Sequence, residues 1–409
     1  MRIFCAVRHS QDPSQFYGGL WNANFYPALR QLGHEIVESQ VDLLPASRFM
    51  GIAGDFTPEE LNLRARITQQ ILEEVRLEHR RGGLDLFLSY FYNSHFDPAG
   101  FDELRRLGIP SINFYCNSIY QFDQVAAIAE KVDFSWHAEM AATPFYTAVG
   151  ARPLWIQMGA DPQIYRPIHG TKPKAKACFV GQRYADRDRW LAALIRAEVL
   201  VDVFGSGWVA PENQTGTVSN SESMEEIYLG RKQSVPGGSD AYLIALRDLI
   251  QKEGPWRGAG RALRQLCYRR ETRELTPLFM KFAKGGVPLE TMIEIFSSYQ
   301  VCLNFSNVWA DGRPGSPLIP HVRLRDFEAP MSRACYLTGH TEEITQFYQP
   351  GTEVDTYQSE AELIDKVRFY LAHPEAGEKL REAGYRRALR DHTWKRRFEE
   401  LFSKAGLKS

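Results

Sequence analysis

Short runs of β-branched and aromatic residues alternate with amphipathic stretches along the first part of the chain. These runs lie at 2–8, 35–39, 84–91, 110–116, 134–138 and 153–158. Apolar runs of this length, separated by helical patterns, are typical of a parallel sheet covered by helices on both faces. A long helix is predicted to begin at Pro58 and to end near residue 80, because Thr57 and Glu60 have the spacing of a capping box. The first part of the chain is therefore predicted to be an α/β domain.

The alternation stops and then starts again in the second half. Its later strand-like runs lie at 175–181, 199–205, 300–305, 334–338 and 352–357, and helical patterns follow almost to the C-terminus. The stretch 158–173 separates the two alternations, is rich in Pro and Gly, and has no helical period. We therefore predict two α/β domains in series, residues 1–165 and residues 166–409.

Residues 209–276 interrupt the second alternation. A polar loop is followed there by helical segments with arginines at 257, 261, 264, 269, 270 and 273. One interpretation is a basic surface that contacts an anionic acceptor or a membrane. The other is a solvated helical insertion whose charge is partly balanced by Glu253, Glu271 and Glu274. The sequence leaves both interpretations open.

Composition argues against several classes of protein. The 409 residues carry 49 Lys and Arg against 50 Asp and Glu, so no overall basic field favours binding to nucleic acid. The apolar run at the N-terminus is broken by Arg8 and is too short for a signal peptide or a membrane span, which favours a cytoplasmic protein. The six cysteines are scattered without the spacing of a zinc site. We expect no bound metal ion, and we expect the thiols to be small core residues in a reducing compartment.

Residues 201–210 fit a strand followed by the G-x-G-x-x-A dinucleotide fingerprint. That fingerprint requires a helix that begins within the glycines, so that its N-terminus faces the pyrophosphate. Here Pro211 and a polar loop follow, which argues against a dinucleotide cofactor. Gly205 could still let the backbone come close to a nucleotide, or it could simply form a tight turn.

The strongest motif is R-x-F-E-A at 325–329, followed by an apolar strand and by a P-G-x-E loop at 350–353. This segment resembles the C-terminal domain of group 1 glycosyltransferases, especially the branch of the CgeB-like spore-maturation proteins. The resemblance implies the α/β GT-B architecture, in which two Rossmann-like domains have parallel sheets facing a central cleft. It also implies transfer of a sugar from a nucleotide-sugar, which is a co-substrate and not a cofactor. The resemblance does not identify the acceptor. The classes left open are a glycan, a small molecule, a lipid and a protein.

Two side chains of this motif suit a nucleotide-sugar. Glu328 can accept paired hydrogen bonds from a ribose diol, and Arg325 can bind a diphosphate. In the wider family, another glutamate lies eight positions before the one that corresponds to Glu328. This chain has Pro320 at that position. The alternative is that Glu328 and Arg325 form an ordinary surface ion pair, which contributes about 0–1 kcal/mol.

A second candidate site lies where a strand ends in Gly181 and a helix follows. Backbone N–H groups at the start of that helix, together with an arginine, can stabilise the charge on a departing nucleoside diphosphate. The family has a basic residue in this region, and the resemblance assigns its role to Arg187 first and to Arg183 second.

Weaker candidates follow other strands. Lys284 precedes a helix, and Asn304 ends a strand in a region where family members contact the base. In the first domain, Gly18 and Gly19 follow the first strand, and glycine there permits close approach of the backbone to a ligand. His95 follows a later strand and is the candidate general base, because histidine titrates near neutral pH. The alternative is a histidine with a purely structural role.

These observations predict a metal-independent glycosyltransferase whose partners are a nucleotide-sugar and an unidentified acceptor. One alternative is a GT-B enzyme that is not a transferase, such as a nucleotide-sugar epimerase. The other is a catalytically degenerate GT-B protein that only binds, which Pro320 suggests.

Overall fold

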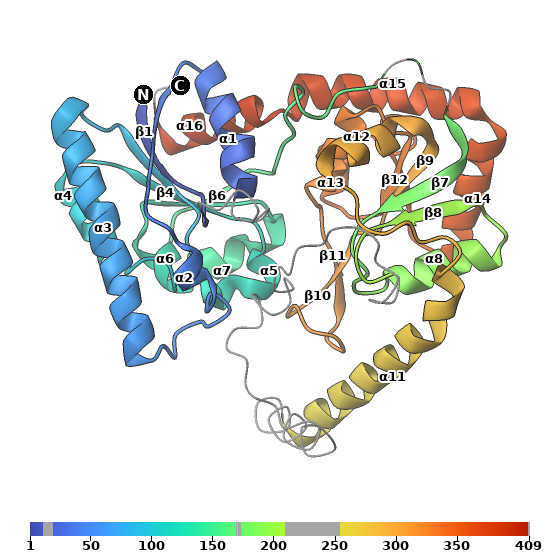
Figure 1. The fold of residues 1–409 in the computed structure, drawn as a ribbon, viewed down its shortest axis with the longest axis horizontal. Helices are drawn as coiled ribbons and strands as arrows, with labels where there is room; N and C mark the ends of the chain where they lie inside the picture. The colour runs from blue at the N-terminus through green and yellow to red at the C-terminus, as the bar shows by residue number, and fades with distance from the viewer. Residues whose placement is uncertain (11–18, 169, 171–172, 209–253, 408–409) are drawn as a thin grey trace. The chain divides into compact units, whose positions relative to one another are not determined.

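The computed structural model describes residues 1–10, 19–168, 170, 173–208 and 254–407, and its contacts divide the chain into two compact units (Figure 1). The described residues of the first unit come from Met1–Met158 and Trp394–Ser409, and those of the second come from Gly159–Ser219 and Val235–Thr393. Residues 159–165 therefore group with the second unit, although our predicted boundary follows residue 165. The last helix of the chain groups with the first unit.

The first unit is built on a six-stranded parallel sheet with the order β2-β1-β3-β4-β5-β6. Its strands are β1 (Arg2–Ala6), β2 (Glu35–Glu38), β3 (Leu86–Ser89), β4 (Ser111–Tyr115), β5 (Phe134–His137) and β6 (Pro153–Trp155). Its helices are α1 (Leu20–Gln31), α2 (Leu44–Ser47), α3 (Pro58–Gly82), α4 (Gly100–Arg106), α5 (Ser118–Gln121), η2 (Phe122–Gln124), α6 (Ala126–Lys131), η3 (Met140–Ala142), α7 (Thr143–Ala148) and α16 (Trp394–Ala405).

Two helices of this unit show how local sequence sets the fold. Helix α3 begins with the predicted capping box: the Thr57 hydroxyl accepts from the Glu60 N–H at 3.3 Å, and the Glu60 carboxylate accepts from the Thr57 N–H at 2.7 Å. Helix α16 packs on α1, where the rings of Trp394 and Phe398 both meet Phe25 edge-on. These aromatic contacts bury the apolar face of α16 and hold the end of the chain against α1.

The second unit is built on a five-stranded parallel sheet with the order β13-β12-β9-β7-β8, and it also has an antiparallel pair, β10 and β11. Its strands are β7 (Lys174–Val180), β8 (Val201–Phe204), β9 (Tyr299–Asn304), β10 (Asn307–Trp309), β11 (Leu318–Pro320), β12 (Tyr336–Gly339) and β13 (Asp355–Tyr357). Its helices are α8 (Arg187–Arg196), α11 (Pro255–Phe279), α12 (Leu289–Ser298), α13 (Arg325–Met331), η5 (Ile344–Gln346), α14 (Glu360–Ala372) and α15 (Pro374–Asp391).

Helix α11 forms the last part of the predicted insertion between β8 and β9, and residues 209–253 of that insertion lie outside the described residues. Leu275 and Phe279, near its C-terminal end, are buried in the core of the second unit. Its N-terminal half extends away from the sheet (Figure 1). The loop between β10 and β11 fixes that half, because the Arg264 guanidinium donates to the Gly315 carbonyl at 2.9 Å.

The structure confirms the predicted α/β class with parallel sheets in two domains. Each apolar run that we identified overlaps one parallel strand, from β1 to β6 in the first unit and at β7, β8, β9, β12 and β13 in the second. The pair β10 and β11 was not predicted, because each of its strands has three residues and shows no clear alternation. No helix in the part of the chain described combines the length and the apolar composition needed to cross a bilayer.

Candidate functional site

The strand order of the second sheet places a candidate ligand site at one edge. Strand β7 lies between β8, which follows it in the chain, and β9, which comes later and pairs on its other side. The strand order therefore reverses between β7 and β9. In open parallel sheets, ligands bind outside the carboxyl ends of the strands at such a reversal of strand order. The loop after β7 meets strand β10 there: Asn307 Nδ2 donates to the Asp186 carboxylate at 2.6 Å, and the Trp309 N–H donates to the Tyr184 hydroxyl at 3.3 Å.

Arg187 is the first residue of α8 and is buried at this edge, with 7% of its surface exposed. One Nη donates to the Gln182 carbonyl at 2.6 Å, and the guanidinium lies over the rings of Phe179 and Tyr184. Its buried Nε has no hydrogen-bond partner in the described part of the chain. A buried cation with an unused donor is poorly compensated by the protein alone, and an anionic ligand would complete its interactions.

Arg323 brings a second positive charge to the same edge. Its backbone N–H donates to the Asp326 carboxylate at 2.7 Å, its Nη2 donates to the Asn307 carbonyl at 3.0 Å, and its buried Nε has no partner among the residues described. Burial, together with the positive charges of Arg323 and Arg325, lowers the pKa of Arg187 to about 9. These three residues, Arg187, Arg323 and Arg325, are called the arginine cluster below. Asn307 connects the first two, because it donates to Asp186, which directly precedes Arg187, and accepts from Arg323.

Glu328 lies on α13 beside this cluster and is buried. Its two carboxylate oxygens accept from the Tyr165 hydroxyl at 2.5 Å and from Arg325 Nη1 at 2.7 Å. The side chains of Arg325 and Glu328 are 24% and 6% exposed, so the pair is not the surface ion pair that the sequence left open. Each carboxylate oxygen can accept a second hydrogen bond, which leaves Glu328 able to bind a ribose hydroxyl.

Two other candidates, Arg183 and Gly205, form contacts within the second unit. The Arg183 guanidinium forms an ion pair with Asp188 at 2.6 Å and is buried, so in this structure its charge is already compensated. The Gly205 N–H donates to the Gly285 carbonyl at 2.7 Å. A Cβ on Gly205 would lie 2.2 Å from the Gly181 carbonyl oxygen, and its φ is +134°. Close packing of two loops therefore explains this glycine without a nucleotide.

Asn304 and Lys284 are held by carboxylates of the second unit. Asn304 Nδ2 donates to Asp326 at 3.3 Å and is buried at the end of β9, where it orients the carboxylate that receives the Arg323 N–H. Lys284 Nζ lies 4.0 Å from the Asp202 carboxylate in β8. The structure thus connects Asn304 indirectly to the arginine cluster and pairs Lys284 with a different group.

His95 follows β3, at the point between β1 and β3 where the strand order of the first sheet reverses, and its ring lies 4.3 Å from that of His9. His95 Nδ1 accepts from the Tyr92 N–H at 3.0 Å, and its Nε2 lies 2.9 Å from the Ser47 hydroxyl, which donates to the Leu43 carbonyl. This network assigns the proton to Nε2. Burial, with a smaller contribution from His9, lowers the pKa of His95 well below its usual value. The ring has no unused lone pair for a general base in this arrangement.

The glycines predicted after β1 are only partly described. Gly18 lies outside the described residues, and Gly19 precedes the first residue of α1. Its φ is −110°, and a Cβ there would meet Asn22 at an ordinary 3.5 Å, so local geometry does not require glycine. His9 also follows β1 and was not predicted; its Nε2 donates to the Tyr90 carbonyl at 2.6 Å.

Sequence reasoning also missed two residues of the second unit. Arg323 stands two positions before Arg325 in the motif that we singled out, so the signal was present. Tyr165 is 163 residues away from Glu328 in the chain, and only folding brings the two together. Among the residues described, no three His, Cys, Asp or Glu side chains are grouped to hold a metal ion.

Comparison with known proteins supports the same conclusion about the fold. Residues 267–403 match a protein-family model described as "Glycosyl transferase-like". Sucrose-phosphate synthase from Thermosynechococcus elongatus is similar over 99% of both chains, with a TM-score of 0.56 and 12% identity. AviGT4, a glycosyltransferase of avilamycin A biosynthesis, has a TM-score of 0.54 and 14% identity over 99% of this chain and 96% of its own. The chain has the GT-B fold.

A third GT-B neighbour is HepE from Anabaena, solved in complex with UDP and glucose, with a TM-score of 0.54 and 9% identity over 99% of this chain and 98% of its own. Curated protein sequences give no significant match. In this GT-B chain the family match includes Arg323, Arg325 and Glu328, whereas Arg187 lies outside it. Fold similarity at these identities does not define chemistry, which must be argued from the site. The likeness to the CgeB-like branch stays a prediction.

Proposed function

We propose that this protein is a glycosyltransferase that binds a nucleoside-diphosphate sugar at the carboxyl edge of the second sheet and transfers the sugar to an acceptor. The arginine cluster is the observation that carries this proposal. Arg187 and Arg323 each have a buried Nε without a partner in the described part of the chain, and Arg187 forms no ion pair there. A diphosphate supplies both the negative charge and the acceptor oxygens that such guanidinium groups bind. The UDP held by HepE is a ligand of this chemical class.

The same arginines would act on the reaction itself. When the bond between the sugar and the diphosphate breaks, negative charge builds up on the departing diphosphate. Buried, fixed cations stabilise developing charge strongly, because little solvent screens them and they need not reorganise. Removal of one such donor typically costs about 100- to 1,000-fold in rate. We propose that these arginines replace a metal ion, so that the reaction proceeds in EDTA, and that no organic cofactor takes part.

Glu328 would position the nucleotide. Its carboxylate is held from two sides, by the Tyr165 hydroxyl and by Arg325, and it is kept away from solvent. A carboxylate fixed in this way can accept hydrogen bonds from the two hydroxyls of a ribose in a defined direction. The ribose and the diphosphate are adjacent parts of a nucleotide-sugar, as Glu328 and the arginine cluster are adjacent in the site.

A second function, binding without transfer, is favoured by Pro320. The wider family has a glutamate at this place, but here Pro320 ends β11 and faces Asn307 of β10 in the register. The proline side chain has no acceptor atom to contact a sugar. A protein that binds the nucleotide-sugar but lacks turnover would have this arrangement.

Turnover of a panel of UDP-, GDP- and dTDP-sugars tests the proposal, with release of nucleoside diphosphate as the readout. We expect one donor to be turned over, with the same rate in EDTA. Arg187→Met should lower that rate by about 100-fold or more. Arg189→Met, two residues along the same helix, is the matched control, because Arg189 is half-exposed and pairs with Glu271. Binding of a donor without turnover would support the second function, and neither binding nor turnover would refute both.

A further inference from the structure

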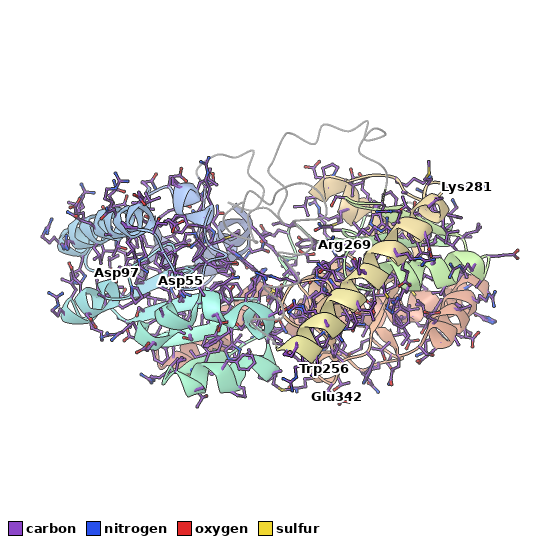
Figure 2. All side chains as sticks on the ribbon, turned by 90° about the horizontal axis from the view of Figure 1, so that it is seen from below. Asp55, Asp97, Trp256, Arg269, Lys281 and Glu342 are labelled. Atoms are coloured by element: carbon purple, nitrogen blue, oxygen red, sulfur yellow. The ribbon has the colours of Figure 1, made fainter. Side chains whose placement is uncertain are left out.

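Helix α11 has two apolar faces, and the second unit covers one of them. Leu275 and Phe279 on the inner face are buried, whereas Trp256 is 90% exposed, Leu263 63% and Leu266 43%. Separations of seven and three residues place these three side chains on one face of an α-helix. Figure 2 shows Trp256 at the first turn of α11 and Arg269 further along the same helix. We call Trp256, Leu263 and Leu266 the α11 stripe.

The contacts that hold the N-terminal half of α11 lie on the side opposite the stripe. Arg261 forms an ion pair with Asp311, and the Tyr268 ring meets Trp309 edge-on at 5.2 Å. Both residues project from the face that is turned towards the loop after β10. The α11 stripe therefore contributes nothing to these contacts, and its exposure needs another explanation.

Basic residues border the stripe on both sides. Residues 255–270 contain five arginines and no acidic residue. Arg257 and Arg264, seven residues apart, form a row on one side, and Arg269 and Arg273, four residues apart, form a row on the other. Three of the four, all except Arg264, form no hydrogen bond or ion pair within the part of the chain described. Their charge is available to an external anion.

We propose that α11 binds the surface of a membrane that contains anionic lipids. The stripe would enter the boundary between headgroups and acyl chains, with Trp256 at the interface, while Arg257, Arg269 and Arg273 contact lipid phosphates. An apolar stripe with Trp and Leu between rows of arginine is the composition of helices that lie in a bilayer surface. A membrane with anionic lipids has negative charge at its surface and an apolar layer beneath. These two layers match the arginines and the α11 stripe. This inference does not depend on the proposed function.

Vesicle flotation tests the apolar part of the proposal. The full chain should float with phosphatidylcholine vesicles that contain phosphatidylglycerol and should not float with phosphatidylcholine alone. The double variant Trp256→Ser, Leu263→Ser should bind about tenfold more weakly or worse. Leu200→Ser is the matched control, because Leu200 is 56% exposed in the turn after α8, and it should bind as the wild type does.

The charged rows are tested in the same assay. Arg257→Gln with Arg269→Gln should weaken binding to the anionic vesicles about tenfold or more, and added salt should weaken the wild type in the same direction. Arg80→Gln with Arg386→Gln removes two exposed arginines from α3 and α15 and should change nothing. Unchanged circular dichroism and thermal unfolding would show that the variants are folded.

A second measurement needs only a conservative variant. Lipids brominated on their acyl chains should quench part of the tryptophan emission of the wild type, and this part should be missing in Trp256→Phe. No flotation with anionic vesicles would overturn the proposal, as would equal binding by the stripe variant. Self-association of the chain that the same substitutions abolish would identify α11 as a protein interface and would also overturn it.

Discussion

Replacement of Arg187 by methionine should separate stability from ligand binding. Methionine has a similar length and can keep the contacts with the Phe179 and Tyr184 rings, but it carries no charge. The substitution therefore removes a buried cation without leaving a large cavity. We expect the ligand-free protein to become more stable and its stabilisation by nucleotide to become smaller.

The structure gives the size of the first effect. Burial is the main cause that lowers the Arg187 pKa from its usual value to about 9, and this shift corresponds to roughly 5 kcal/mol of destabilisation of the charged fold. The bond to the Gln182 carbonyl offsets about 1.5–3 kcal/mol of this, and the two aromatic faces offset about 0.5–2 kcal/mol. Arg187→Met should therefore raise the free energy of unfolding by roughly 0–3 kcal/mol. Because the folded-state pKa is the lower one, the penalty is present at every pH below about 9, including neutral pH.

The second effect is measured by thermal or chemical unfolding with and without nucleotide at pH 7. A nucleoside diphosphate at 100 times its Kd should stabilise the wild type by about 2.7 kcal/mol. Loss of a charge-assisted contact of about 1.5–3 kcal/mol weakens binding, so the same concentration should stabilise Arg187→Met by only about 0.3–1.3 kcal/mol. The control Arg189→Met should keep the full shift, because its partner Glu271 lies at the surface.

Two results would contradict the proposed role of Arg187. If Arg187→Met unfolds several kcal/mol more easily than the wild type, Arg187 is a structural residue whose charge is well compensated. If the nucleotide shift is the same in both proteins, the arginine cluster is not the diphosphate site.

Three further predictions concern Gly205, Tyr165 and His9. Gly205→Ala should destabilise the protein by at least about 2 kcal/mol, because its Cβ would collide with the Gly181 carbonyl at a positive φ; a loss below about 1 kcal/mol in urea unfolding would contradict the loop packing. Tyr165→Phe should cost about 1.5–3 kcal/mol in the wild type and much less in a Glu328→Gln background, and equal costs would show that the two groups are not coupled. Burial lowers the pKa of His9 to about 4, so the free energy of unfolding decreases as the pH falls from about 6.5 to 4. His9→Gln should make the decrease between pH 7 and pH 5 smaller by about 2 kcal/mol. An unchanged dependence of stability on pH would argue against a neutral, buried ring.

The fold could be predicted from the sequence because strands and helices are set by local periodicity. The capping box at Thr57 and Glu60 defined the start of α3 correctly, since both groups bond within four residues of each other. The sequence prediction placed residues 166–409, including the last helix, in the second domain. Helix α16 returns to the first unit through contacts such as that between Trp394 and Phe25, which are far apart in the chain.

The candidate site was harder to predict, because a residue's type does not show which partner it has. Arg183 and Arg187 are four residues apart and equally basic, yet Asp188 compensates the charge of the first, and the second has an unused donor in the described chain. His95 was selected by its place after a strand, but the folded chain uses both of its ring nitrogens. Tyr165 could not be found at all from sequence, since its role depends on a contact made only in the fold.

Calorimetric titration of the protein with UDP, GDP and dTDP, and with the corresponding nucleosides, measures whether the arginine cluster binds a diphosphate. We expect one diphosphate to bind with one molecule per chain and much more tightly than its nucleoside. We also expect this difference to be lost when Arg187 and Arg323 are both replaced by methionine. Equal affinities for diphosphate and nucleoside, or an unchanged affinity in that double variant, would contradict the claim that the arginine cluster binds the diphosphate.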